Sequence, residues 1–228
     1  MPSIKGSTVL VIGGSSGIGY GVAEKCLLEG AIIYIASSNA SYAGKKITAH
    51  VCDLADEDVK QNLERLLSDI GLLDHIIFTA GDALPIQPLD TINLDIICRA
   101  AKLTPRFVKA GPKSSLMFTT GAGYLTGLHG ITRNLALDLK PLRVNLVCSG
   151  LVATPLWASD GVPDNMKDGT TLGKVGRVEE VAKAYVYFIK DINSTGACIG
   201  TNTGSLLLWS PQQCKYLVPC DLWVCSHL

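Results

Sequence analysis

The stretch Val9–Gly19, with the sequence VLVIGGSSGIG, decides the expected fold. Four β-favouring apolar residues run into a glycine-rich turn, and a helical pattern follows directly, up to about Glu29. This order predicts a buried strand, a tight turn and the start of a helix. Backbone N–H groups and the positive end of the helix dipole meet at such a turn and favour a phosphate. A strand, turn and helix without any ligand is the alternative interpretation.

The glycines of this turn have separate expected roles. Gly13 allows the tight turn, Gly17 lets the backbone approach a pyrophosphate, and Gly19 lets the helix pack closely on the strand. The whole turn resembles the T-G-x-x-x-G-I-G cofactor turn of short-chain dehydrogenases/reductases, with Gly13 at the position where that family usually has Thr. The resemblance implies cofactor contacts from Gly13, Ser15, Ser16, Gly17, Ile18 and Gly19.

Length and composition suit one α/β domain. The chain has 228 residues, of which 47% are hydrophobic and 18% charged, and its mean hydropathy is +0.29. Such a composition is typical of a parallel sheet covered on both faces. We therefore expect a single-domain, doubly wound Rossmann-type sheet over residues 1–208, with shortened crossover elements. Residues 209–228 form an apolar tail that matches nothing in the family and stays unassigned.

Charge and targeting signals narrow the partners. The formal net charge is zero and the longest basic run is Lys45-Lys46, which argues against a nucleic-acid partner. No apolar run is long enough to span a membrane, and the N-terminus lacks the pattern of a signal peptide. A cytoplasmic location and a small-molecule substrate are the expectations, and the sequence leaves open whether the chain forms a homo-oligomer.

Eight cysteines raise the question of disulfides or a metal. None forms a C-x-x-C pair, and three crowd into the last fifteen residues with a spacing that fits no zinc pattern, so no metal is expected. The other five lie in apolar contexts, where buried thiols are ordinary packing residues. These five are Cys26, Cys52, Cys98, Cys148 and Cys198.

The end of the second expected strand bears on the type of cofactor. Ala31–Ala36 reads as a strand, and Ser37, Ser38 and Asn39 come directly after it. In Rossmann folds an acidic residue here binds the ribose 2′-OH of NAD and repels the 2′-phosphate of NADP. Because these three residues are neutral, the sequence favours NADP(H). The alternative is that they form only a turn.

The third expected strand, Lys46–Cys52, runs into Asp53-Leu54. The resemblance implies that Asp53 and Leu54 lie against the adenine, although Asp53 could also just cap the next helix, Asp56–Ile70. Only about seven residues separate strands two and three, whereas a parallel crossover normally takes a dozen or more. We therefore expect one face of the sheet to be poorly covered there.

The fourth expected strand, Asp74–Thr79, leads into Ala80-Gly81. Thr79-Ala80-Gly81 resembles the family's N-A-G motif, which implies that Ala80 and Gly81 lie beside the cofactor ribose. His75 is interpreted as a strand-edge residue rather than a catalyst. The helical pattern Leu89–Ala110 is expected to break at Pro105, which lies inside it.

The residues after the fifth expected strand, Ser115–Thr120, decide the chemistry. Thr120 stands where the family has its catalytic Ser, and Thr126–Asn145 resembles the active-site helix and the following R-V-N strand. In active members that helix opens with Y-x-x-x-K, in which the Tyr is the general acid/base and the Lys lowers its pKa. A gapless alignment on Thr132-Arg133 puts Gly121 and Leu125 at these two positions.

The acid/base pair is therefore absent as a pair. Tyr124 is the best remaining candidate for a proton donor, and Thr120 is a second catalytic candidate or simply a β-favouring Thr. The one true Y-x-x-x-K in the chain, Tyr42 to Lys46, lies in the wrong loop and is interpreted as coincidence.

The stretch Cys148–Trp157 resembles the family's P-G-x-x-x-T segment, with Ser149 in place of Pro. The resemblance implies that Val152 and Thr154 meet the nicotinamide carboxamide. Ser159–Gly173 is expected to be a mobile substrate loop, with Trp157 at its hinge as a pocket or core residue. A helix over Val178–Lys190 and a last strand within Thr195–Gly204 complete the pattern.

Three functions remain open from the sequence. The first is an NADP(H)-dependent reductase for a carbonyl or imine of a small natural product, since the active-site helix is closest to fungal secondary-metabolism members of the family. The second is a non-redox cyclase or isomerase derived from a reductase. The third is a catalytically inactive remnant, which the shortened connections favour.

Overall fold

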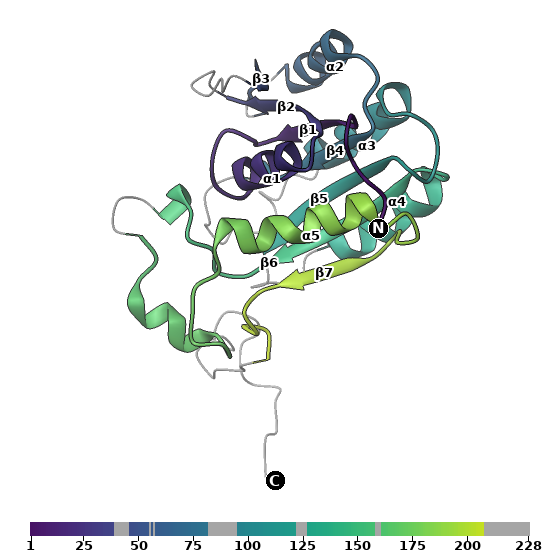
Figure 1. Ribbon diagram of the computed structural model, residues 1–228. Helices are drawn as coiled ribbons and strands as arrows, with labels where there is room; N and C mark the ends of the chain where they lie inside the picture. The colour runs from purple at the N-terminus through teal and green to yellow at the C-terminus, as the bar shows by residue number, and fades with distance from the viewer. Residues whose placement is uncertain are drawn as a thin grey trace, which may run out of the picture.

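A computed structural model describes residues 1–38, 46–54, 56, 58–81, 95–121, 127–157 and 161–207. In these residues, seven parallel strands form one sheet in the order β3-β2-β1-β4-β5-β6-β7 (Figure 1). The order reverses beside β1, which has β2 on one side and β4 on the other. This is the doubly wound, Rossmann-type arrangement that the sequence predicted.

The strands are β1 (Thr8–Ile12), β2 (Ile32–Ser37), β3 (Ile47–Val51), β4 (His75–Phe78), β5 (Ser115–Gly121), β6 (Arg143–Ser149) and β7 (Cys198–Thr201). The α-helices are α1 (Gly17–Leu28), α2 (Val59–Ile70), α3 (Asp95–Phe107), α4 (Leu128–Asp138) and α5 (Val178–Lys190). The short 3-10 helices η2 (Pro155–Trp157) and η3 (Asp164–Gly169) lie between β6 and α5. The sequence predicted all of these α-helices and strands to within a few residues at most ends, because each carries its own apolar pattern. The exception is α3, where the predicted pattern began in residues outside the described ranges.

Each strand contributes to two cores because its successive side chains point to opposite faces of the sheet. Val9 and Val11 pack with α1 and α5 on one face. Leu10 and Ile12 pack with α2 and α3 on the other. Burial on both faces explains the uninterrupted apolar sequence of β1. In Figure 1, α1 and α5 cover the face of the sheet that is turned toward the viewer.

The short connection between β2 and β3 does not prevent their pairing. The two strands are parallel, with Ile33 opposite Ile47 and Ser37 opposite Val51. The expected thin cover appears only toward the end of β3. On the α1 face Ile47 is buried, whereas Val51 is 61% exposed.

His75 is a correction to the sequence interpretation. It lies in β4, a central strand, with 2% of its surface exposed, rather than at an edge of the sheet. Its Nδ1 is 2.9 Å from the Ser115 hydroxyl oxygen of the neighbouring strand. His75 lies at the amino end of β4, away from Ala80-Gly81, so its role is structural.

Helix α3 is a second correction, because it continues through Pro105 to Phe107. Pro105 lies in the last turn, where the missing N–H removes only the bond that would reach Ala101. Beside Pro105, the Thr104 hydroxyl donates to the Ala100 carbonyl at 2.8 Å. The Val108 N–H donates to the Thr104 carbonyl at 2.9 Å. Pro105 lies two residues before the end of α3, so it costs the helix one hydrogen bond and does not disrupt its interior.

The cysteines only partly follow the expected burial. Cys26, Cys52 and Cys148 are buried free thiols, but Cys98 and Cys198 are exposed. Cys98 lies on α3 and Cys198 on β7, the strand at one edge of the sheet. An apolar local sequence does not distinguish the covered from the open face of such elements.

Arg143 joins β6 to the end of α5. Its guanidinium is buried and donates to the carbonyl oxygens of Phe188 at 2.6 Å and Asp191 at 2.9 Å, and Nε donates to Pro112 at 2.5 Å. A cation at the C-terminus of a helix satisfies its free carbonyls and favours the helix dipole. Burial lowers the pKa of Arg143, and the nearby Asp191 opposes that shift.

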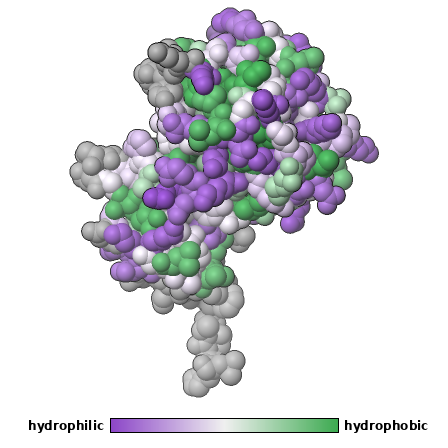
Figure 2. Space-filling model, viewed as in Figure 1, coloured by the Kyte–Doolittle hydropathy of each residue, from purple (hydrophilic) through white to green (hydrophobic). Residues whose placement is uncertain are grey.

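The surface mixes polar and apolar side chains. Figure 2 shows hydrophilic residues spread over the viewed face, interrupted by smaller hydrophobic areas. Single large apolar side chains such as Leu28 and Leu172 are exposed, which is ordinary for a folded chain. None of the helices within the described ranges has the length and apolarity needed to cross a membrane.

The burial of His75 predicts a pH effect on stability. Burial, aided by the charge of Arg143, lowers the pKa of His75 from 6.5 to about 4. The unfolded chain therefore binds a proton that the folded chain refuses between these pH values, and stability falls as pH decreases through this window. We expect His75 to account for a loss of about 2 kcal/mol in unfolding free energy between pH 7 and pH 5.

The measurement is urea denaturation of the wild type and of His75→Asn at both pH values. Asn keeps a polar atom near the position of Nδ1 but does not titrate. The variant should lose less stability than the wild type on acidification. Equal losses in the two proteins would contradict the assignment.

Candidate active site

The turn after β1 is built by glycines that tolerate no side chain. Gly13 has φ +87°, and a Cβ there would lie 2.5 Å from the Ala80 backbone nitrogen. Its N–H donates to the Ala36 carbonyl of β2 at 2.8 Å. The expected role of Gly13 in a tight turn is thus confirmed. Gly14, which the sequence interpretation left without a role, lies where a Cβ would be 2.6 Å from Ile35 Cγ2.

The end of β4 is bonded directly to this turn. The backbone N–H groups of Thr79 and Ala80 both donate to the Ile12 carbonyl, at 2.9 and 3.0 Å, and the Thr79 hydroxyl donates to the same oxygen at 3.0 Å. A Cβ on Gly19 would lie 2.2 Å from the Gly13 carbonyl oxygen. The prediction that Gly19 permits close packing of helix and strand is confirmed. Ala80 is half-buried and Gly81 exposed at this edge.

The first turn of α1 has no side-chain cap. Ser16 is the N-cap residue but makes no side-chain cap bond, and no acidic residue lies in the first turn. The first N–H groups of a helix lack partners inside it, so they are suited to bind a phosphate. Ser15 and Ile18 are half-buried beside them. Gly17 has φ +52°, and a Cβ there would be 3.4 Å from Thr154 Cβ.

The carboxyl ends of β2 and β3 lie next to the turn. Cys52 N–H donates to the Ser37 carbonyl at 2.8 Å, which places the residues after both strands at one edge. Ser37 is half-buried, and Ser38 and Asp53 are exposed. Leu54 packs against the core on the α2 side of the sheet. Asn39, the other residue predicted here, lies outside the described ranges.

The segment after β6 passes the other side of the α1 N-terminus. Val152 is buried and Thr154 half-buried. Leu151 and Ala153 bond the backbone of Gly176, so Val152 turns its own N–H and C=O away from Gly176. The indole N–H of Trp157 donates to the Val152 carbonyl at 3.0 Å. Trp157 thus belongs to the segment predicted for the nicotinamide.

The catalytic candidates are only partly placed. Thr120 is 8% exposed near the end of β5, two residues beyond Phe118, which belongs to the core on the α2 and α3 side. Gly121 pairs with Ser149 in the sheet, so the position aligned with the family's Tyr belongs to a strand rather than to a helix. Tyr124 and Leu125 lie outside the described residues. Among the predicted catalytic residues, the structure therefore places Thr120 alone.

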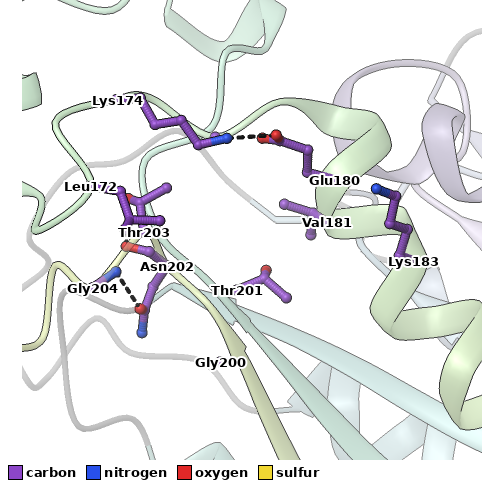
Figure 3. A pocket seen from close by; sticks show the side chains of 11 residues that line it. Leu172, Lys174, Glu180, Val181, Lys183, Gly200, Thr201, Asn202, Thr203 and Gly204 are labelled. Atoms are coloured by element: carbon purple, nitrogen blue, oxygen red, sulfur yellow. Dashed lines mark hydrogen bonds and ion pairs between the residues drawn. The ribbon is translucent and has the colours of Figure 1, made fainter.

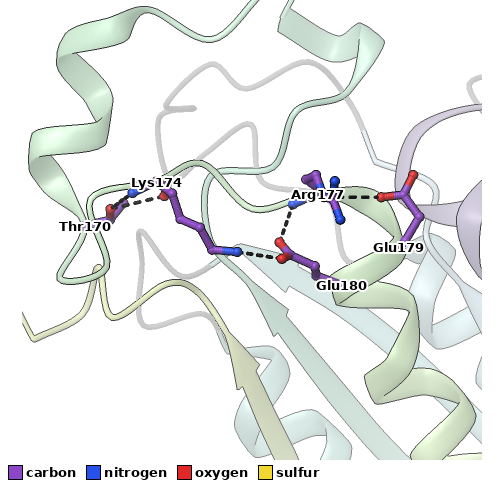
Figure 4. Close-up of polar contacts among 5 residues, drawn as sticks. All are labelled: Thr170, Lys174, Arg177, Glu179 and Glu180. Carbon is purple, nitrogen blue, oxygen red and sulfur yellow. Dashed lines mark hydrogen bonds and ion pairs between the residues drawn. The ribbon is translucent and has the colours of Figure 1, made fainter.

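The chain between η3 and α5 is held by polar contacts (Figure 4). Thr170 is buried, and its hydroxyl accepts the Lys174 N–H at 3.1 Å. The Lys174 ammonium bonds the Glu180 carboxylate at 2.5 Å, and Arg177 N–H bonds the same carboxylate at 2.9 Å. The bond from Lys174 is the main cause that lowers the pKa of Glu180. This is the returning end of the predicted substrate loop.

A hollow of about 390 Å³ lies between that segment, the start of α5 and the end of β7. Figure 3 shows Lys174 and Glu180 bonded to each other on one side of it and Thr201 on another. The Thr201 hydroxyl is buried without a hydrogen-bond partner among the described residues. Gly176, which pairs with Val152, lines the hollow, but none of the predicted site residues does.

The glycine turn, the uncapped start of α1 and the strand order together define a Rossmann fold. A family model described as an SDR-like Rossmann domain matches residues 3–208. The chain therefore belongs to the short-chain dehydrogenase/reductase family of oxidoreductases, as the sequence predicted.

Several fungal members are similar over most of the chain. Short-chain dehydrogenase/reductase fsr5 of Gibberella fujikuroi is 34% identical, over 90% of this chain and 96% of its own. ATR9 of Stachybotrys chlorohalonatus is 35% identical, over 91% of this chain and all of its own. The solved structure of MalC Reductase/Diels-Alderase from Malbranchea aurantiaca superposes with a TM-score of 0.77 at 33% identity, covering 90% of this chain and 98% of that one.

The relatives are longer within the matched region. The alignment with fsr5 extends over 254 positions but includes only 90% of the 228 residues here, or about 205 residues. About 49 positions, the difference between 254 and 205, are therefore gaps in this chain. Despite these gaps, the described residues form the complete seven-strand sheet. The connection between β2 and β3 is one of the short segments of this chain.

The packing of Gly19 predicts a selective effect of one added methyl group. Gly19→Ala places a Cβ against the Gly13 carbonyl and the Thr79 hydroxyl, so we expect a loss of about 2–3 kcal/mol in unfolding free energy. Gly130→Ala is the matched control, because Gly130 is exposed in α4 with no atom within 4 Å of its added Cβ.

Urea denaturation of both variants is the measurement. Gly130→Ala should be neutral or stabilising by up to ~1 kcal/mol, since Ala favours a helix more than Gly does. A Gly19→Ala variant as stable as the control would show that the turn relaxes around the methyl group.

Proposed function

We propose that the protein is an NADP(H)-dependent reductase that acts on a carbonyl or imine of a small secondary-metabolite substrate. The observation that carries the proposal is the point where the strand order reverses, at which the glycine turn after β1 touches the end of β4 and the first turn of α1 has no side-chain cap. Open α/β sheets bind their ligands in the crevice outside the carboxyl ends of the strands, at the point where the strand order reverses. The pyrophosphate would bind at Gly17–Gly19, the adenosine beyond the ends of β2 and β3, and the nicotinamide beside Val152 and Thr154.

The preference for NADP(H) rests on the end of β2. Ser37 and Ser38 are neutral donors, Ser38 is exposed, and Asn39 comes after them in the sequence. A neutral end of β2 accepts the 2′-phosphate of NADPH, whereas a carboxylate would repel it. Asp53, at the neighbouring edge, is assigned to the adenine rather than to the ribose.

The lack of a Tyr-Lys pair bears on the substrate. A hydride added to a carbonyl leaves an alkoxide that needs a proton, while a hydride added to a protonated imine leaves a neutral amine. A positioned proton donor typically contributes about 10²–10⁴-fold in rate. The imine branch of the proposal thus demands least from Thr120 and Tyr124, the two candidate proton donors or hydrogen-bond donors to the substrate.

A second function is favoured by a specific relative. The protein from Malbranchea aurantiaca carries the description Reductase/Diels-Alderase and is 33% identical to this chain. A cycloaddition moves neither a hydride nor a proton, so it does not require the missing pair. A cyclase that binds the substrate in the same crevice is therefore the second candidate.

Cofactor preference is the direct test of the first function. The melting temperature should rise more with NADPH than with NADH, because a ligand stabilises by RT ln(1 + [L]/Kd). Ser38→Asp should weaken NADPH binding by about tenfold or more through repulsion of the 2′-phosphate, with little effect on NADH. Ser38→Asn is the control, since Asn has the shape of Asp without its negative charge.

The outcomes separate the proposals. No shift with either nucleotide would overturn the cofactor site and favour an inactive remnant. Equal shifts with both would overturn the NADP preference.

Turnover then distinguishes the reductase from the cyclase. With a panel of cyclic imines and ketones, we expect NADPH consumption, measured by its absorbance, to be faster for imines than for ketones of similar size. Tyr124→Phe should slow ketone reduction more than imine reduction, because only the ketone needs the added proton. Conversion of a diene-bearing substrate without NADPH consumption would favour the cyclase instead.

A further inference from the structure

The segment after β6 closes on itself through Trp157. The indole N–H donates to the Val152 carbonyl at 3.0 Å, and the Trp157 backbone N–H donates to the Thr154 carbonyl at 3.2 Å. Helix η2 is therefore folded back against the three residues Val152–Thr154. The Trp157 residue is exposed over part of its surface, while the polar edge of its ring is held against the backbone.

The two backbone groups of Val152 differ in their hydrogen bonding. The Leu151 carbonyl accepts the Gly176 N–H, and the Ala153 N–H donates to the Gly176 carbonyl, both at 2.9 Å. In an extended segment the groups of the intervening residue point to the opposite edge. Across the part of the chain that the structure describes, no hydrogen bond is formed by the Val152 N–H. Val152 therefore offers a free donor beside an acceptor that Trp157 already uses.

This edge lies close to the start of α1. Thr154, two residues on, is the side chain nearest to an added Cβ at Gly17, the first residue of α1. A dinucleotide with its phosphates at α1 brings one of its ends to Val152. A primary carboxamide presents one acceptor oxygen and an NH₂ donor group, and so could use both backbone groups of Val152. A carbonyl shared between two donors gives each of them a weaker bond.

We propose that Trp157 is a specificity-determining residue for the nicotinamide end of the cofactor. By occupying the Val152 carbonyl it leaves the Val152 N–H as the recognition group, which binds the carboxamide oxygen, and it makes the carboxamide NH₂ nearly dispensable. The inference deepens the proposed function and rests on it. It concerns the tolerance of the site for nicotinamides that lack the NH₂ group.

The test compares two oxidised cofactors in wild type and in Trp157→Phe. One is NADP⁺, and the other is its 3-acetylpyridine analogue, in which a methyl group replaces the NH₂. Wild type should bind the two within about twofold, because its carbonyl is already engaged. Trp157→Phe keeps an aromatic ring but frees the carbonyl, so it should bind NADP⁺ roughly three- to tenfold more tightly than the analogue, the effect of one net hydrogen bond.

The ratio of the two dissociation constants separates this role from a structural one. A general loosening of the segment would weaken both cofactors together and leave the ratio unchanged. Trp209→Phe and Trp223→Phe are the matched controls, because they remove the same N–H from the C-terminal tail, and they should leave the ratio as in wild type. An unchanged ratio in Trp157→Phe overturns the inference.

Two outcomes do not depend on the folding of the variant. A wild type that prefers NADP⁺ tenfold over the analogue shows that the NH₂ group is recognised. This result overturns the inference on Trp157 but leaves the proposed function standing. A wild type that binds neither cofactor overturns the proposed function itself. The two failures are therefore distinguishable by direct titration of the wild type.

Discussion

The close approach between the turn after β1 and the end of β4 is the contact on which the rest of the structure depends. The Ile12 carbonyl accepts hydrogen bonds from the N–H groups of Thr79 and Ala80. A side chain at position 13 would clash with the Ala80 backbone, so this position needs glycine. Gly19 then packs α1 onto the same point. This backbone contact aligns β1 with β4 and positions the first turn of α1 at the point where the strand order reverses. The fold and the candidate cofactor site are therefore built by the same atoms.

A second set of contacts fixes α5 against α1 and against the sheet. A Cβ on Gly21 would lie 2.1 Å from Val178, so α1 and α5 touch closely at this point. Lys190 at the end of α5 bonds Glu29 at 2.8 Å, and Arg143 ties the same end of α5 to β6. The start of α5, to which the segment after β6 returns, is thus held close to α1. The bond from the Trp157 indole to the Val152 carbonyl is local, because η2 folds back on the residues just before it.

The fold and the chemistry of the family are separable in this chain. Two apolar cores and a parallel sheet form although the connection between β2 and β3 is short and no Y-x-x-x-K occurs in the sequence after β5. Core packing is spread over many side chains, whereas a proton donor is one residue on a connecting segment. Such segments tolerate deletion far better than buried strands do. A member of the family can therefore keep the sheet and the glycine turn while the segments that carry the chemistry change.

The sequence by itself determined the class of fold and the cofactor turn. Apolar runs, helical spacing and the glycines of Val9–Gly19 are local signals, and their physical meaning does not depend on distant residues. Only the tertiary structure decided which local signals were overridden. His75 is buried because β4 is central, and Pro105 is tolerated because α3 ends two residues later. The bond from Trp157 to Val152 likewise depends on how η2 folds back, a geometry that residue order leaves open.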